Sequence, residues 1–449
     1  MLCKNKKGDI TMAKGERKKE KHGNKKVKRA VLIILLVLVC IFVGSIIFFE
    51  IDPENTNIDF SPADTENVTD KTIKFNSDGK LKILHIADTH LNYDKHFDAS
   101  IWVIAEACDV EKPDLVVLTG DNTHPDEDPE KTKELINALM NIFDSRNIPV
   151  AVTFGNHDAE KGPMTRADIM KYYSTFSCTI PFEDSVDFKN CATLNIPVLA
   201  SDSDEVKFNL WVFDSGDYDE DEPRHYDRVR TEQIEWYKEK SRELRQANGG
   251  ETINSVVFQH IIVPEVYDAL KKIDSKQPYA VKHIYNEDEY YVFDPEVTNY
   301  GTLNEKPCPG YYNDGQFDAL VETGDVLAMF TGHDHTNAFG VRYKAIDIYT
   351  SPMTRYKGLA YTTQYGYRVV EIDENDTTSY DTRVERLYDV FDFSYIKTAK
   401  DNGDWYSARI AFELAVKGAA QEAYLNLWQS VVEFFTGRTV TYPDYQSSK

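Results

Sequence analysis

The chain of 449 residues is too long for one small domain, and its 41% hydrophobic and 12% aromatic residues can bury a large core, which excludes a mainly disordered protein. Residues 1 to 29 carry 12 Lys/Arg against 3 Asp/Glu, whereas residues 50 to 449 carry 39 basic against 72 acidic residues. So acidic a body argues against nucleic acid held in a basic groove, unless metal ions supply the positive field.

Residues 30 to 49, AVLIILLVLVCIFVGSIIFF, form an uncharged run of the length that crosses a hydrocarbon core, and they predict a transmembrane helix. A cleaved signal peptide has a shorter apolar region of about 7–15 residues and ends in small residues. The basic flank predicts that residues 1 to 29 stay in the cytoplasm. We therefore expect a single-pass protein of the cell membrane that contacts the lipid bilayer through residues 30 to 49, with residues 50 to 449 outside.

Residues 50 to 72 are acidic, polar and poor in large apolar groups, which is typical of a flexible stalk. From residue 73, short apolar runs alternate with helical patterns. Strands are predicted at 82 to 87, 115 to 118, 149 to 154, 208 to 213, 255 to 258, 326 to 330 and 367 to 372. Helices are predicted at 99 to 111, 130 to 146 and 231 to 246. This alternation indicates an α/β fold with a parallel sheet and crossover helices over residues 73 to 390.

Residues 264 to 312 have few periodic signals and many tyrosines, which indicates an excursion over one face of the body. It either walls a binding site or contributes packed surface aromatics. Residues 391 to 449 form a predicted helical extension, in which an amphipathic helix over 404 to 435 is expected to pack against the body. Its apolar positions are Ile410, Leu414, Leu425, Trp428, Val432 and Phe435.

Four cysteines, Cys108, Cys178, Cys191 and Cys308, fall in the part expected outside the cell, where disulfides can persist. Their spacings match no zinc pattern. A Cys178–Cys191 bridge and buried free thiols are both compatible with the sequence.

Five of the predicted strands are followed at once by residues able to bind a metal ion. These residues are Asp88 and His90, Asp121, Asn156 and His157, His260, and His333 and His335. The carboxyl ends of strands in an α/β sheet meet in one crevice, so these side chains should share a site. Gly120, Gly155 and Gly332 directly precede three of the groups, where a missing side chain lets the strand end turn sharply.

Carboxylate, amide and imidazole groups suit iron, manganese or zinc, and the lack of a thiolate argues against a closed structural zinc site. Calcium is disfavoured because it takes oxygen ligands.

The motifs DTH at 88 to 90, GD at 120 to 121, GNHD at 155 to 158, His260 and GHDH at 332 to 335 resemble the calcineurin-like metallophosphoesterase superfamily. QIEW at 233 to 236 and HIIVPE at 260 to 265 resemble its purple acid phosphatase branch. The resemblance implies an α/β fold with central mixed β-sheets in a four-layer αββα sandwich, two metal ions and hydrolysis of phosphate esters.

The resemblance also implies roles for the residues. One metal ion would be held by Asp88, His90 and His335, the other by Asn156, His260 and His333, with Asp121 bridging the two. His157 would be the catalytic histidine facing the substrate, and Asp158 would orient its ring. Purple acid phosphatases have a tyrosine three residues after the bridging aspartate, where this chain has His124, so their purple colour is not expected and the metal identity stays open.

Two such cations lower the pKa of a shared water, giving a metal-bridging hydroxide in line behind phosphorus, and they neutralise the phosphoryl oxygens. We favour a phosphomonoesterase. A phosphodiesterase acting on nucleotides or lipid head groups would use the same metals and is the alternative. A catalytically silent cell-surface binding module would have lost a ligand, and none is lost. The sequence indicates no oligomeric state.

Overall fold

The computed structural model describes residues 71–182, 188–274, 277 and 280–436. The predicted cytoplasmic tail (1 to 29), transmembrane helix (30 to 49) and nearly all of the predicted stalk (50 to 72) lie outside these ranges. Within them, no helix combines the length and the apolar composition that crossing a bilayer requires.

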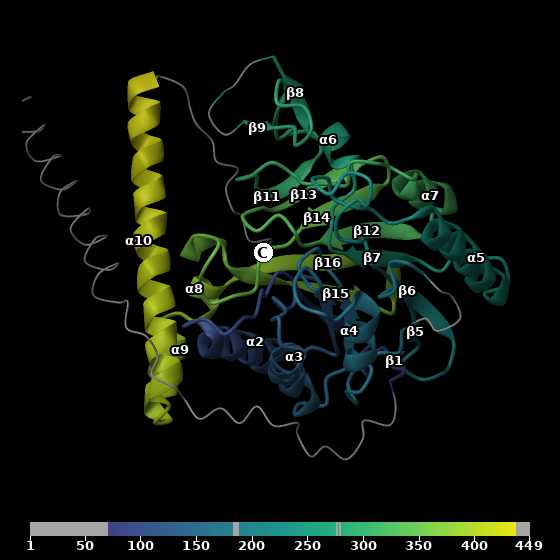
Figure 1. Ribbon diagram of the computed structural model, residues 1–449, viewed down its shortest axis with the longest axis horizontal. Helices are drawn as coiled ribbons and strands as arrows, with labels where there is room; N and C mark the ends of the chain where they lie inside the picture. Colours follow the sequence, from purple (N-terminus) through teal and green to yellow (C-terminus); the bar gives the residue numbers. More distant parts are fainter. Residues whose placement is uncertain (1–70, 183–187, 275–276, 278–279, 437–449) are drawn as a thin grey trace, which may run out of the picture.

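The first sheet has five strands, and the chain enters it through three parallel strands joined by helices. In order across the sheet the strands are β16 (Asp376–Arg386), β15 (Gly366–Asp373), β2 (Lys80–Ile86), β3 (Leu115–Thr119) and β4 (Val150–Thr153). The crossover helices α2 (Phe97–Glu111) and α3 (Pro129–Asp144) lie on the outer face (Figure 1). Asp128 caps α3 by accepting from the backbone N–H of Glu130, and Pro129 occupies the first helical position, where no hydrogen bond is lost.

The second sheet has eight strands, of which the central four are parallel. In order they are β1 (Ile73–Lys74), β5 (Leu194–Leu199), β6 (Val206–Phe213), β7 (Ser255–Gln259), β12 (Val326–Thr331), β14 (Ile346–Thr350), β13 (Ala338–Tyr343) and β11 (Thr298–Thr302). Helices α5 (Thr231–Ala247) and α7 (Gln316–Thr323) lie on its outer side (Figure 1). The predicted α/β fold is confirmed. The strands divide into two mixed sheets, as the resemblance to an αββα sandwich implied, and not into the single parallel sheet that the strand–helix alternation indicated.

Alternating side chains of β6 show how the layers are held together. Phe208, Leu210 and Val212 belong to the core that also contains β2 and β3 of the first sheet. Trp211 and Phe213 point the other way and pack in a second core with Trp236 and Tyr237 of α5. A strand has a side-chain period of two, so one strand serves both cores. The body is therefore layered as helices, sheet, sheet and helices.

The shorter elements complete the chain. They are α4 (Arg166–Tyr173), α6 (Val266–Ala269), β8 (Lys271–Ile273), β9 (Val281–Lys282), β10 (Tyr290–Val292), the 3-10 helix η1 (Thr362–Gln364), α8 (Leu387–Val390) and α9 (Phe393–Asp401). Strands β8, β10 and β9 form a small sheet, so the excursion over 264 to 312 has more regular structure than the sequence predicted. All four cysteines of the described residues are free thiols, which excludes the Cys178–Cys191 bridge here.

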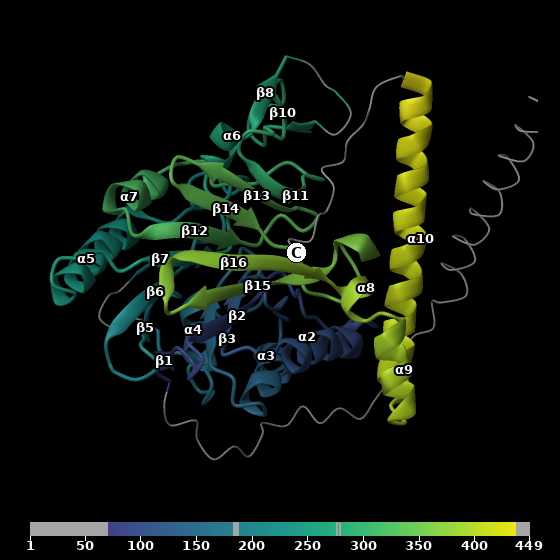
Figure 2. The same cartoon turned by 180° about the vertical axis from the view of Figure 1, so that it is seen from behind.

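Helix α10 (Trp405–Thr436) packs on the body mainly through its first half. Ile410 and Leu414 are buried as predicted, and Ser407 accepts a hydrogen bond from the Trp102 ring of α2 at 2.8 Å. Further along, Leu425 and Trp428 are 38% and 53% exposed, where the sequence predicted packing. Seen from behind, this part of α10 stands clear of both sheets (Figure 2). The side chains of Val432 and Phe435 lie outside the described set.

Candidate metal centre

Each predicted ligand follows the carboxyl end of a parallel strand. Asp88 and His90 follow β2, Asp121 follows β3, and Asn156 follows β4, all in the five-stranded sheet. His260 follows β7, and His333 and His335 follow β12, in the eight-stranded sheet. The two sheets face each other, so the candidate site lies where the ends of both sets of strands meet.

One group of side chains consists of Asp88, His90, Asp121 and His335, whose ligand atoms all lie within 4.8 Å of one another. The Nε2 atoms of His90 and His335 are 2.9 Å apart. His335 Nε2 lies 3.5 Å from Asp88 Oδ1, and His90 Nε2 lies 3.5 Å from Asp121 Oδ2. These short contacts place four possible donors to one cation side by side.

A second group, Asp121, His260 and His333, shares the same aspartate. His260 Nε2 lies 3.3 Å from Asp121 Oδ2 and 3.2 Å from His333 Nδ1. The side-chain oxygen of Asn156 approaches His260 Nε2 to 3.3 Å. The structure thus brings all seven predicted ligands together in two overlapping groups. Their assignment to particular ions stays a prediction.

The backbone at this site adopts unusual angles. Asp88, His90, Asp121 and His333 have φ values of 56°, 43°, 49° and 71°, in the left-handed region that costs a non-glycine residue free energy. Backbone strain of this kind persists where the surrounding structure imposes it, and it concentrates at functional sites. One contact that holds this strained backbone is the hydrogen bond from the backbone N–H of His333 to Asp88 Oδ2 at 2.9 Å.

Two of the glycines identified in the sequence make room for the ligands. A Cβ at Gly155 would lie 2.3 Å from Asp121 Oδ1 and 2.6 Å from His260 Nε2. A Cβ at Gly332 would lie 2.7 Å from Asp88 Oδ2. Any side chain at either position would therefore push into the site.

Burial and neighbouring charges shift the pKa values of the candidate ligands. Burial raises the pKa of Asp88 to about 8, and it lowers the pKa values of His90 and His333 well below the ordinary value, so these imidazoles are neutral, as ligation requires. Burial also lowers the pKa of His260, but the Asp121 carboxylate outweighs it and raises the pKa to about 9, so a cation that binds this imidazole must displace its proton. Asp121 Oδ2 and His333 Nε2 are buried without a hydrogen-bond partner, which costs free energy unless a cation takes that place.

Comparison with known proteins agrees with this geometry. The sequence model of the calcineurin-like phosphoesterase family matches residues 81–337, which is more than half of the chain. The chain belongs to the calcineurin-like phosphoesterase family. As a member of this family it is a phosphoric ester hydrolase. The family depends on two metal ions, and this chain has clustered potential metal ligands.

Individual relatives are more distant. The chain is 26% identical to "Probable inactive purple acid phosphatase 14" of Arabidopsis thaliana over 64% of this chain and 74% of that protein. It is 25% identical to "Phosphatase DCR2" of Saccharomyces cerevisiae over 59% of this chain and 46% of that protein. A solved dimetal phosphatase from Danio rerio aligns with a TM-score of 0.42 at 13% identity, covering 65% of this chain and 92% of that one.

Contacts around His157 differ from those expected in this calcineurin-like phosphoesterase. Asp158 does not orient the His157 ring. Its carboxylate accepts hydrogen bonds from the backbone N–H groups of Asn122 at 2.9 Å and Gly155 at 2.8 Å, so it ties two ligand loops together. The carboxylate that pairs with the His157 ring is Glu160, whose Oε2 lies 2.7 Å from Nδ1. Because Glu160 engages Nδ1, the Nε2 atom is the ring nitrogen that can face a substrate.

Two further residues orient ligands from outside the predicted set. His124 Nε2 lies 2.8 Å from His90 Nδ1, which leaves His90 Nε2 to face the site. Tyr218 accepts a hydrogen bond from Asn156 Nδ2 at 3.0 Å, and this turns the amide oxygen of Asn156 toward His260. Tyr218 was not predicted from the sequence, although it lies in the loop that follows β6 and so at the same sheet edge as the ligands.

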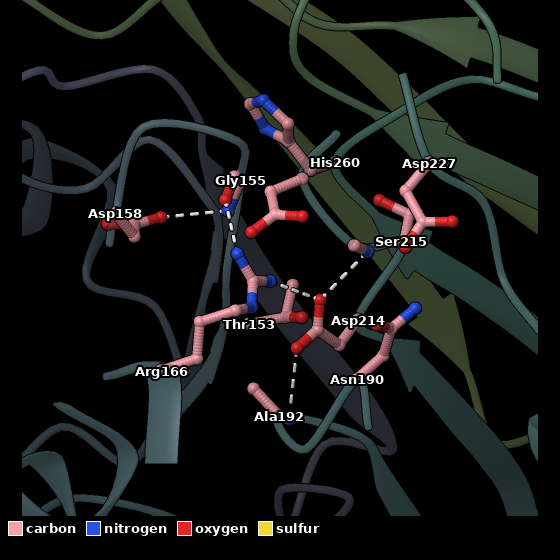
Figure 3. Close-up of polar contacts among 12 residues, drawn as sticks. Thr153, Gly155, Asp158, Arg166, Asn190, Ala192, Asp214, Ser215, Asp227 and His260 are labelled. Atoms are coloured by element: carbon pink, nitrogen blue, oxygen red, sulfur yellow. Dashed lines mark hydrogen bonds and ion pairs between the residues drawn. The ribbon is translucent and has the colours of Figure 1, made fainter. Parts of the chain in front are cut away.

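A buried ion pair supports the Asn156 loop from behind. Arg166 donates from Nη1 to the carbonyl oxygen of Gly155 at 2.8 Å and from Nη2 to Asp214 (Figure 3). Asp214 also accepts from the backbone N–H of Ala192 at 3.2 Å, so the pair connects the end of β4 to the loop after β6. Removing one member of a buried ion pair destabilises a fold, because the other charge is then left buried without a partner.

We expect Arg166→Met to lower the free energy of unfolding by about 3–5 kcal/mol, because Asp214 would be left buried without its cation. Chemical unfolding followed by tryptophan fluorescence measures this. Arg146→Met is the matched control, since its pair with Asp109 is partly exposed and should contribute about 0–1 kcal/mol. Equal losses in the two variants would contradict the supporting role of Arg166.

Proposed function

We propose that this protein hydrolyses phosphate esters, monoesters in preference to diesters, at a centre of two metal ions. The observation that carries the proposal is that two ligand groups overlap in one shared carboxylate, Asp121. On this proposal one ion is held by Asp88, His90 and His335, the other by Asn156, His260 and His333. The donor set suits iron, manganese or zinc. When bound, the ions activate water near neutral pH and neutralise charge on the phosphoryl oxygens.

The protein's own groups then position the substrate and handle the proton. His157 stands beside His90 with ring centroids 5.4 Å apart, held by Glu160 on its far nitrogen. From there it can contact a phosphoryl oxygen or give a proton to the departing alkoxide. The word "inactive" in the name of the Arabidopsis relative concerns that protein. In this chain the seven candidate ligand side chains lie close together, which supports an active enzyme over a silent binding module.

Asp121→Asn should abolish activity and weaken the binding of both ions, because it removes the only negative charge that the two ligand groups share. Elemental analysis of the purified variant, alongside turnover of a nitrophenyl phosphate, measures both effects. Asp126→Asn, a partly exposed carboxylate five residues away, serves as the control and should retain metal and activity. An active Asp121→Asn variant that still holds two ions would show that Asp121 does not bridge them.

His157→Ala should spare metal binding and slow alkyl phosphates far more than nitrophenyl phosphate, whose leaving group hardly needs a proton. A loss of about a hundredfold or more for the alkyl ester is the expected size. Turnover of both esters at matched metal occupancy is the measurement. If His157 only grips the phosphoryl group, both esters slow alike, and undiminished activity on both would remove His157 from the site.

We propose, as a separate point, that the catalytic body lies outside the cell membrane. The support is the sequence alone, with its basic residues 1 to 29 followed by the uncharged run 30 to 49.

Protease added to intact cells should therefore cleave the body from the cell surface, because the acidic segment 50 to 72 would be accessible. Immunoblotting of the intact and the released protein measures this, with a cytoplasmic marker as the control for leakage. A body that resists protease until the cells are broken would reverse the orientation.

A further inference from the structure

Two tyrosines stand directly against the candidate metal ligands. The ring of Tyr226 meets the His333 ring edge to face, with centroids 4.3 Å apart. Tyr218 stacks on Tyr226 at 5.6 Å, and its hydroxyl holds the Asn156 amide. Both tyrosines are only partly buried. An aromatic surface therefore begins at the ligands of the second ion group.

The surface continues outward through four more rings. His225 and Tyr311 are stacked at 3.9 Å, and Tyr285 meets Tyr311 edge to face at 4.9 Å. Tyr312 packs against Tyr311 at 5.0 Å. Tyr311 and Tyr312 are 46% and 42% exposed. We call these residues the aromatic face: Tyr218, His225, Tyr226, Tyr285, Tyr311 and Tyr312.

Backbone hydrogen bonds fix the aromatic face. The loop after β6 closes on itself, with the N–H of Asp219 donating to the carbonyl oxygen of His225 at 2.8 Å. The N–H of Tyr311 donates to the carbonyl oxygen of Tyr226 at 3.2 Å, which joins the long excursion to this loop. Tyr285 donates its hydroxyl to the carbonyl oxygen of Pro309 at 2.8 Å. Rings held in this way need little further ordering when they bind a flat group.

Charge around the aromatic face disfavours a polyanion. The loop that carries Tyr218 reads DYDEDE over residues 217 to 222. The guanidinium of Arg228, which lies over Tyr312 at 5.2 Å, is already paired with Asp219 at 3.2 Å and Asp314 at 2.7 Å. A single phosphoryl group bound at the metal centre, joined to an uncharged ring, is compatible with these charges. A chain of phosphates would meet the acidic loop.

We propose that the aromatic face binds the leaving group of the substrate, and that the preferred substrates are monophosphate esters of flat aromatic compounds, either an aryl alcohol or a nucleoside. This inference rests on the proposed function. The physical basis is stacking of the planar group on tyrosine and histidine rings, which favours rings of many kinds over a sugar or alkyl chain.

Two pairs of substrates test the proposal with the full-length, metal-loaded protein. Adenosine 5′-monophosphate and ribose 5-phosphate release the same kind of alkoxide and differ only in the base. Phenyl phosphate and a fluorinated alkyl phosphate of matched leaving-group acidity differ only in the ring. We expect kcat/KM to favour the aromatic member by about tenfold or more in at least one pair. The pair that shows the preference distinguishes a nucleoside from an aryl alcohol.

Variants of Tyr311 show whether the aromatic face causes the preference. Tyr311→Leu should reduce the ratio of aromatic to non-aromatic kcat/KM several-fold, whereas Tyr311→Phe, which keeps a ring, should preserve it. Tyr361→Leu removes a 70% exposed tyrosine elsewhere and should leave all four rates unchanged. Equal rates within both pairs, or a preference that survives Tyr311→Leu intact, would overturn the proposal.

Calorimetric binding separates this inference from the proposed function. If no ester is hydrolysed, the proposed function fails, but affinities for adenosine 5′-monophosphate and ribose 5-phosphate can still be compared in the same protein. Tighter binding of the nucleotide that is lost in Tyr311→Leu would support the aromatic face as a binding surface. Equal affinities together with absent hydrolysis would exclude it.

Discussion

The negative charge of Asp121, buried where the strands of two sheets end, is the constraint on which the rest of the site depends. A carboxylate with one oxygen lacking a hydrogen-bond partner is costly in a protein interior unless positive charge lies next to it. Imidazoles from both sheets approach that oxygen, His90 at 3.5 Å and His260 at 3.3 Å. Neither sheet alone could supply both, so the face-to-face packing of the sheets is what makes two ligand groups possible.

The free-energy cost of this arrangement appears as backbone strain in the loops that carry the ligands. Four ligand residues have left-handed backbone angles, and Gly155 and Gly332 cannot carry a side chain without entering the site. Asp158 and the Arg166–Asp214 pair hold the loops through backbone groups. These contacts reach the backbone next to the ligands and so fix the positions of the donor atoms. Such preorganisation is required of any site that must hold metals at defined distances.

Much of the site could be predicted because its signal is local: an apolar strand, a glycine and a metal-binding side chain follow one another, as in the run from β3 to Asp121. The family resemblance implied the two-sheet division, but the strand pattern alone could not predict it, because strand pairing depends on contacts far apart in the sequence. The edge strand β16 has a single buried residue and no apolar run to reveal it. Whether Asp158 or Glu160 contacts the His157 ring depends on the conformation of the loop. The residue types at these positions do not determine that conformation. In α10 the apolar pattern continues beyond the half that meets the body, so composition gives no sign of where packing ends.

An acidic protein that acts on an anionic substrate has to attract it without a general positive surface. Screening limits the field of exposed carboxylates to about 8–10 Å at moderate salt, so the acidic body weakens the approach of a phosphate only modestly. Close to the site, bound cations would dominate, and the Asp-rich loop at 217 to 222 acts at the same short range with the opposite sign. A substrate with one phosphoryl group is compatible with both the cations and the acidic loop, because its charge stays at the metal centre and its uncharged end lies over the aromatic face. A substrate with several phosphates is attracted by the cations but repelled by the acidic loop. The same charges that make the body acidic would thus contribute to selectivity at the site.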